Sequence, residues 1–248
     1  MLVAMIVLSA AVVSAEPCLK TTPETNSLSR ALITFVDEHG QVDYSGIAKS
    51  RTATFSTYLD SISRLCSKTY ESLDVDSKAA LLINFYNIWV LDFMSDGDGK
   101  PMSILKVRVK GKSIFDAPII RVAWYPKNIS LNHLEKHILK GVKPDPRIHM
   151  ALVCGAKSCP KLRRSAFSGT RLNDELNDEV ERFLSDPIRN QLDAKIWKVS
   201  KIFDWYRDDF GKNQDAIVKW ILEHRKGPST TPERLEYLEY DWAPNTQN

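Results

Sequence analysis

The chain has 248 residues, with 34 Lys and Arg against 31 Asp and Glu and a formal net charge of +3. Hydrophobic residues make up 43% and charged residues 26%, which is ordinary globular usage and excludes a disordered chain, a collagen and a coiled coil. This small charge, without a long Lys/Arg block, gives no reason to expect a nucleic-acid partner, and the length is enough for a domain with its own core.

Residues 1–15 form an uncharged apolar run, MLVAMIVLSAAVVSA. Val13 and Ala15 are the small residues that a signal peptidase requires before Glu16, and the run is shorter than the about 20 apolar residues that span a bilayer. The pattern predicts a cleaved secretory signal and no stable membrane span after cleavage. An uncleaved anchor and a buried first helix are the alternatives.

Three helices are expected next. Residues 27–38 and 55–65 carry apolar side chains at helical spacing, which predicts two amphipathic helices. Residues 76–94 are apolar nearly all round, as is typical of a central core helix. A polar turn over residues 96–99 ends this helix.

The apolar stretches become shorter after residue 104. Residues 104–129 predict two or three short strands in hairpins. A capped helix is expected over residues 131–140, and a strand with apolar residues on both faces over residues 147–153. The remaining expected elements are helices over residues 173–184, 202–210 and 215–224 and a strand over residues 195–200. This order predicts one α+β domain, in which core helices pack on a small, mostly antiparallel sheet.

One predicted helix has a carboxylate on its apolar stripe. At 3.6 residues per turn, Glu135 lies between Leu131 and Ile138. A carboxylate on an apolar face must find a partner or take a raised pKa, so Glu135 is a candidate for chemistry as well as for a structural network. His133 and His137 lie beside the stripe, four residues apart, where they share a ligand or are simply solvated.

A second candidate cluster lies in the strand over residues 147–153 and the loop CGAKSCP that follows it. His149 is expected in the interior, where it must be hydrogen-bonded. Cys154 ends the strand at a tight turn, and Lys157 can lower the pKa of a nearby thiol. Cys159 precedes a possible helix start, whose positive end also favours a thiolate.

Three chemistries fit these residues, and their spacing does not choose among them. A Cys154 thiolate with His149 as base and Glu135 or Asn87 as orienter suits acyl transfer. Two cysteines with a histidine can bind zinc. Cys154 and Cys159 can instead form a disulfide, which persists outside the cytosol.

The other two cysteines and a sequon bear on the compartment. The four cysteines allow three full pairings, among which Cys18 with Cys66 would tie the mature N-terminus to the first helical region. Asn128 begins the sequon Asn-Ile-Ser, which is used only if the host glycosylates.

Asn84 and Asn87 lie on one side of the apolar helix over residues 76–94. There they are expected to brace neighbouring backbone more than to take part in catalysis.

Five stretches resemble one family. They are NFYN (84–87), SLNHLEKHIL (130–139), DPRIHMALVCGAKSCP (145–160), KIFDWYRDDF (201–210) and YDWAPN (240–245). Together they resemble the family catalogued as domain of unknown function 547, over roughly residues 75–245 and preceded by a helical part over residues 16–74. The third stretch is the specific one. Pro244 stands where the family tends to have Leu.

The resemblance implies a single globular domain of a kind found in bacterial secreted proteins and in plant proteins, and it implies no established activity. It groups Glu135, His137, His149, Cys154 and Cys159 as one constellation. The family also occurs in proteins expected to stay in reducing compartments, which weakens a purely structural disulfide.

These observations predict a secreted or periplasmic protein and leave three possible functions. The first is a thiol-dependent hydrolase or acyl or amide transferase for a small-molecule or peptide substrate, without a cofactor or resident metal. The second is a non-catalytic binding or scaffold domain with a disulfide-braced loop. The third is a metalloprotein that uses His149 with the cysteines. The expected catalytic residues are Cys154, His149, Glu135 and Cys159, and the expected substrate-binding residues are Asn87, His137 and Lys157. The oligomeric state stays open.

Aromatic residues are frequent in the last third of the chain. Most are expected on helix and strand faces that pack on the core, and a stacking platform for a ligand is the alternative. They are Trp197, Phe203, Trp205, Tyr206, Trp220 and Trp242.

Overall fold

The computed structural model describes residues 17–50, 53–95, 102–227 and 230–247. The predicted signal over residues 1–15 and the polar turn over residues 96–99 lie outside this part of the chain, so both stay predictions. None of the helices in the described ranges is long and apolar enough to cross a membrane.

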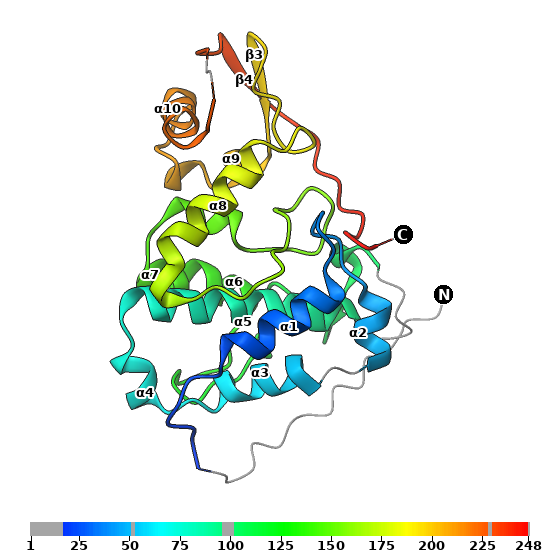
Figure 1. Ribbon diagram of the computed structural model, residues 1–248, viewed down its shortest axis with the longest axis vertical. Coiled ribbons are helices and arrows are strands. Elements are labelled where there is room, and N and C mark those ends of the chain that lie inside the picture. Colours follow the sequence, from blue (N-terminus) through cyan, green and yellow to red (C-terminus); the bar gives the residue numbers. More distant parts are fainter. Residues whose placement is uncertain (1–16, 51–52, 96–101, 228–229, 248) are drawn as a thin grey trace.

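The first half of the chain is helical and forms one end of the molecule (Figure 1). Its helices are α1 (Thr25–Phe35), α2 (Tyr44–Ser50), α3 (Ala53–Ser63), α4 (Ser67–Ser72) and α5 (Val75–Ser95). Helices α1 and α3 confirm the two amphipathic helices predicted there. Disulfide Cys18–Cys66 ties the segment before α1 to the start of α4, as one of the expected pairings would do.

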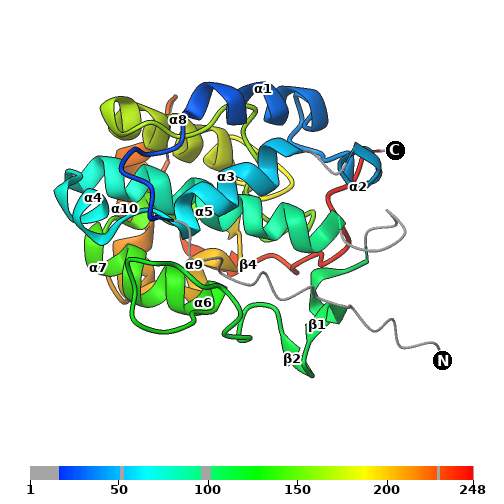
Figure 2. The same ribbon diagram turned by 90° about the horizontal axis from the view of Figure 1, so that it is seen from below.

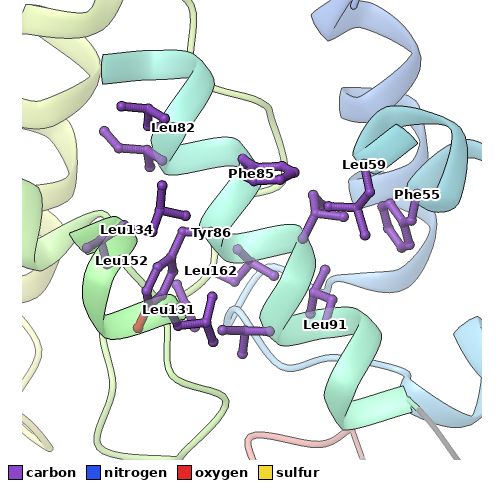
Figure 3. Close-up of a cluster of buried hydrophobic side chains, with 14 of the residues drawn as sticks. Phe55, Leu59, Leu82, Phe85, Tyr86, Leu91, Leu131, Leu134, Leu152 and Leu162 are labelled. Atoms are coloured by element: carbon purple, nitrogen blue, oxygen red, sulfur yellow. The ribbon is translucent and has the colours of Figure 1, made fainter. Parts of the chain in front are cut away.

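Helix α5 is the centre of the fold, as its nearly uniform apolarity predicts. The other N-terminal helices and the 131–142 helix surround it (Figures 1 and 2), and 15 of its 21 residues are buried. Figure 3 shows Phe55 and Leu59 of α3 packed on one side of α5, and Leu131 and Leu134 on another. Tyr86 points from α5 toward this second side, which is where the candidate site lies.

The second half of the chain has shorter elements. They are η1 (Ile104–Lys106), β1 (Arg108–Val109), β2 (Lys112–Ser113), α6 (Leu131–His133), η2 (Leu134–Leu139), α7 (Lys140–Val142), η3 (Pro146–Met150), η4 (Gly169–Arg171), α8 (Leu172–Leu184), β3 (Ile196–Val199), α9 (Ile202–Trp205), η5 (Arg207–Asp209), α10 (Gln214–His224) and β4 (Arg234–Tyr237). The helix expected over residues 202–210 therefore forms as two short pieces, α9 and η5.

The α+β class is confirmed, and its strands form two separate pairs. Strands β1 and β2 are an antiparallel hairpin, and β3 and β4 run parallel, with Ile196 opposite Arg234. The parallel pair and α10 lie at the end of the molecule away from the N-terminal helices (Figure 1). After β4 the C-terminal tail returns to the first end, where Thr246 pairs with Val42.

The strand predicted over residues 147–153 is wrong. The structure has the 3-10 helix η3 there, followed by an irregular segment. Pro146 occupies the first turn, and the Asp145 carboxylate accepts the Arg147 backbone N–H at 3.0 Å, which starts a helical turn. A short run with apolar residues on both faces suits a buried strand and a buried turn equally well, so its pattern could not separate them.

Segment 148–152 joins the two hydrophobic cores of the molecule. Ile148 and Leu152 belong to the large core around α5, whereas Met150 packs in the smaller core formed with α8, β3 and α10. Tyr240 of the C-terminal tail contacts both cores. His149 is thus held at the junction by buried neighbours on either side.

Candidate functional site

The helix that carries Glu135 is continuous over residues 131–142 but contains a π-helical segment, η2. The Ser130 hydroxyl caps it as predicted, accepting the His133 backbone N–H at 3.1 Å. The wider π turn buries Leu139, whereas Ile138 is only partly buried. Glu135 stays on the buried face, 7% exposed. Such π segments are rare and are found mostly at functional sites.

His149 lies between two carboxylates. Its Nε2 atom is 2.9 Å from Asp209 Oδ2, and its Nδ1 atom is 4.0 Å from Glu135 Oε1. The ring packs on Tyr206 with 3.8 Å between the ring centroids. Burial lowers the pKa of His149, and the two carboxylates only partly offset this effect. The imidazole is therefore neutral near pH 7.

Asp209 is the anchor of this imidazole. Burial disfavours its ionised form, but hydrogen bonds from Lys140 and His149 outweigh burial and lower the pKa of Asp209. The ion pair with Lys140 also ties η5 to α7. Asp209 is thus ionised, and its carboxylate accepts the Nε2–H of His149.

Over the ranges that the structure describes, Glu135 has no Lys or Arg partner, and the Tyr86 and Tyr206 hydroxyls are the groups that hydrogen-bond its carboxylate. Its Oε1 atom is buried and has no hydrogen-bond partner among the described residues. Tyr86 and Tyr206 are close enough that burial first, and then the charge of Glu135, raises the pKa of each phenol. Both hydroxyls keep their protons and are donors. A buried carboxylate oxygen without a hydrogen-bond partner is uncommon in a folded protein and calls for an explanation.

Two cavities meet at these residues. Glu135, His149, Trp205 and Tyr206 line both of them. The larger, about 650 Å³, is bordered by charged residues, including Lys140 and Asp209. The other, about 270 Å³, is further lined by Tyr86, Ser113, Phe115, Asp116, Asn132, Leu152, Cys154, Pro160, Ile202, Tyr240 and Trp242.

Trp205, Tyr240 and Trp242 form an aromatic edge of the smaller cavity, and Trp205 also lines the larger one. Trp205 is 47% exposed, and its ring stacks on Trp242 with 5.7 Å between the centroids. Tyr240 contacts both tryptophans. The three rings therefore pack together at this cavity, and whether they stack on a ligand stays a prediction. Trp197 and Phe203 are core residues, as expected.

Loop 154–160 closes one wall of the smaller cavity, and a Cys154–Cys159 disulfide spans it. The loop is held from behind by the buried Arg189, whose Nε and Nη2 atoms donate to the carbonyls of Cys159 and Lys157 at 2.6 and 2.7 Å. The C-terminal tail pairs with its other side, where Ala156 lies opposite Pro244. The pairing also shows that Pro244 is accommodated in the tail.

The structure brings three of the predicted catalytic residues to one cavity and places Cys159 behind them. Glu135, His149 and Cys154 line the smaller cavity, and Cys159 is fully buried. No hydrogen bond joins His149 to Cys154 in the part of the chain that the structure describes.

The predicted substrate-binding residues lie elsewhere. Asn87 is buried and braces the backbone, donating to the Ala151 carbonyl and accepting the Val153 N–H, each at 2.9 Å. His137 is exposed and packs beside His133, away from the cavities. Lys157 is exposed and borders neither cavity.

Sequence reasoning missed several residues of the site. No pattern in the sequence singles out Asp209. Tyr206 is among the aromatic residues expected mostly to pack on the core, and Tyr86 lies in the predicted core helix over residues 76–94. The stretch KIFDWYRDDF, which carries the family resemblance, contains Tyr206 and Asp209 and was the available signal. No group of three or more His, Cys, Asp or Glu within the described ranges is arranged to hold a metal ion.

The comparisons with known proteins bear on the family alone. Residues 70–184 match the family described as "Protein of unknown function, DUF547", which confirms the resemblance over that range. The stretches over residues 201–210 and 240–245 lie outside the match, so their part of the resemblance stays a prediction. No curated protein and no solved structure gives a match. The matched range contains Glu135, His149 and both cysteines of the loop, whereas Tyr206 and Asp209 follow it.

Proposed function

Because residues 70–184 carry the DUF547 domain, to which no function is assigned, we propose a function from the site itself: hydrolysis or acyl transfer at an amide or ester bond. Glu135 and His149 are its proton-transfer pair, and Cys154 in its reduced form is its nucleophile. The observation that carries this proposal is the buried, unpartnered Glu135 Oε1, which faces His149 Nδ1 at 4.0 Å.

The proton positions support proton transfer at this pair. Asp209 accepts the Nε2–H of His149, so the neutral ring has its lone pair on Nδ1. Glu135 Oε1 and His149 Nδ1 are then two acceptors 4.0 Å apart. A group that carries a proton, such as a water or a substrate N–H or O–H, fits between them and satisfies both.

Cys154 supports the acyl-transfer class. It lines the same cavity as Glu135 and His149, at a turn where Gly155 has φ +75°. In the disulfide its sulfur is not a nucleophile, so thiol chemistry requires reduction of the Cys154–Cys159 bond. His149 then takes the thiol proton and returns it to the leaving amine or alcohol.

The aromatic edge supports a substrate with an apolar or flat group. Trp205, Tyr240 and Trp242 border the cavity that contains Cys154, and the exposed Trp205 provides a surface on which such a group can stack. A small acyl compound or a peptide side chain is of suitable size for the smaller cavity of about 270 Å³. With the secretory signal predicted over residues 1–15, the proposal is of a substrate outside the cytosol.

The test is a set of activity measurements on chromogenic esters and peptide amides, with a mild reductant present. Replacement of the proton-transfer groups in Glu135→Gln and His149→Asn is expected to lower kcat/KM about 100-fold or more. Cys154→Ser is expected to abolish turnover. The matched control is His137→Asn, which should keep full activity. His137 lies on the same helix as Glu135 but away from the cavities. Full activity of Cys154→Ser would refute the thiol mechanism.

A non-catalytic binding domain is the second candidate, because three separate features hold loop 154–160 in place: the disulfide, Arg189 and the C-terminal tail. It predicts no turnover of any ester or amide, with or without reductant, together with saturable ligand binding that changes Trp205 fluorescence. Trp205→Ala would remove that signal and weaken binding. Turnover that depends on Glu135 would exclude this candidate.

A further inference from the structure

We propose that the Cys154–Cys159 disulfide is redox-active: small thiols attack it from the cavity at Cys154, and Cys159 leaves as a stabilised thiolate. This thiol–disulfide exchange is inferred from the geometry of loop 154–160 alone. Its role as the step that activates Cys154 rests on the proposed function.

The two sulfurs differ in access. Cys154 is partly exposed and lines the cavity of about 270 Å³, whereas Cys159 is fully buried behind it. An external thiolate therefore reaches only the sulfur of Cys154. Attack at one defined sulfur also fixes which cysteine becomes the leaving group.

The surroundings of Cys159 favour its thiolate. The backbone N–H groups of Cys154 and Ala156 donate to Cys159 Sγ at 3.2 and 3.4 Å. The Tyr240 hydroxyl donates to Cys159 Sγ at 3.3 Å and also lies 3.4 Å from Cys154 Sγ, so the two N–H groups are what distinguishes Cys159. Burial raises the pKa of Tyr240, so this phenol keeps the proton that it donates. Hydrogen bonds of this kind stabilise a thiolate, and a thiolate of lower basicity leaves faster.

The turn at Gly155 creates this arrangement. Its φ of +75° lies in the left-handed region, which lets the chain direct two nearby N–H groups at one sulfur. A side chain here would also meet Met94, whose Cγ lies 3.1 Å from the position of a Cβ. The loop therefore depends on glycine at this position.

The exchange is balanced with a dithiol, or two monothiols, as reductant. A thiolate sulfur of the reductant bonds to Cys154 Sγ, the Cys154–Cys159 bond breaks, and its electron pair passes to Cys159 Sγ. The second reductant thiolate then attacks the first reductant sulfur, and Cys154 leaves as a thiolate. The reductant is oxidised to a disulfide, the protein gains two electrons, and the two protons of the reductant end on the two cysteines.

The loop keeps its place when the bond opens. The hydrogen bonds from Arg189 to the Cys159 and Lys157 carbonyls do not involve the sulfurs. The Lys157 N–H donates to the Ala243 carbonyl at 2.8 Å, and the Asn245 N–H donates to the Gly155 carbonyl at 3.1 Å. Reduction therefore exposes a thiol to Glu135 and His149 in a preformed cavity.

Disulfide Cys18–Cys66 is an internal reference for the test. Cys18 is exposed, but no hydrogen bond reaches either sulfur of this pair in the described part of the chain. The folded protein is incubated with a glutathione or dithiothreitol buffer, quenched with an alkylating agent and analysed by peptide mass. We expect Cys154–Cys159 to open at least tenfold faster than Cys18–Cys66. Accessibility alone predicts the reverse order, and observing equal rates or that reverse order would overturn the proposal.

Three variants locate the chemistry. Tyr240→Phe keeps the ring but removes the hydroxyl, and it should slow reduction about tenfold, the effect of one hydrogen bond to a charged group. Cys159→Ser should trap a mixed disulfide with glutathione on Cys154. Cys154→Ser should leave a buried Cys159 that does not react in the folded protein. An unchanged rate in Tyr240→Phe would contradict the assignment of Cys159 as the stabilised leaving group.

The exchange is measured without any ester or amide, so it is independent of turnover. Fast opening without turnover under reducing conditions would refute the hydrolase or transferase and keep the redox activity. Turnover in the reduced protein, with slow and unselective opening of the disulfide, would refute the redox activity and keep the hydrolase or transferase.

Discussion

The molecule holds two clusters of buried carboxylates that differ in what faces them. On α8, Glu175 and Glu179 are 3% and 5% exposed. The Arg163 guanidinium lies 3.7 and 3.4 Å from them, and further arginines complete both ion pairs. At the cavity, Glu135 is 7% exposed and faces a neutral imidazole and two phenols. Burial is common to both clusters, and the difference between them is that no Lys or Arg pairs with Glu135 among the described residues.

The largest effect on stability is expected from a substitution that breaks the ion pairs of Glu175 and Glu179. Arg163→Leu leaves two buried carboxylates with fewer cations and should lower the free energy of unfolding by about 3 kcal/mol. Glu135→Gln deprives no cation of its partner and should change that quantity by less than about 1 kcal/mol. Urea unfolding followed by tryptophan fluorescence measures both. A loss of 3 kcal/mol or so in Glu135→Gln would mean that the two clusters are both structural.

A control for this experiment is an exposed ion pair. Lys219 and Glu223 are 3.8 Å apart and largely exposed on α10. Lys219→Leu should change the free energy of unfolding by no more than about 0.5 kcal/mol, because exposed pairs contribute little. A large effect there would show that replacing a charge by Leu is itself the cause.

Two asparagines of α5 test the candidate site against the rest of the core. Each makes two hydrogen bonds to backbone, but only Asn87 bonds the segment that leads to Cys154. Asn84 binds the N–H and C=O of Phe167, and Asn87 binds the Ala151 C=O and the Val153 N–H, all at 2.9 Å. Alanine at either position should cost about 2 kcal/mol of unfolding free energy. Only Asn87→Ala should also lower activity and the rate of disulfide exchange, since Asn87 holds the segment that ends at Cys154. Equal activity in both variants would contradict this positioning role.

The sequence predicted the parts of the fold that depend on strong periodicity. Helix α5 was found because nearly every side chain is apolar, and Glu135 was found because it interrupts an apolar stripe. The 3-10 helix at His149 was missed because five residues with apolar neighbours on both sides do not determine a period. The π segment at Glu135 was missed because a helix of normal pitch explains the same stripe.

The sequence could not assemble the site, for a related reason. Asp209 is 60 residues from His149 in the chain, and no local pattern shows that the two meet. Tyr206 is interpreted mainly as a core residue because aromatic rings at these spacings usually are, and nothing in the sequence singles out Tyr240. His137 and Lys157 were predicted to bind substrate because they are close in sequence to Glu135 and Cys154. In the structure both are exposed, away from the cavities.

The smallest expected effect is a pH dependence that comes from His149 itself. Its pKa is lowered below the ordinary value of 6.5 by burial, although Asp209 and Glu135 oppose the shift and Lys140 adds to it. Between the lowered pKa and 6.5 the unfolded chain binds a proton that the folded protein does not. Stability from this group is therefore complete above pH 6.5 and decreases as the pH falls through that interval.

His149→Asn should remove this part of the pH dependence. His133 also has a lowered pKa, from burial first and then from His137 and Lys127, so the quantity that isolates His149 is the difference between the wild-type and variant curves. Unfolding free energies between pH 4.5 and 7.5 suffice, because Asp209, whose pKa is lowered, stays ionised there. If the two curves are parallel, His149 is not held neutral by its site. The ring would then take up a proton at its ordinary pKa of 6.5, and the lone pair on Nδ1 that the proposed mechanism places opposite Glu135 would be lost below that pH.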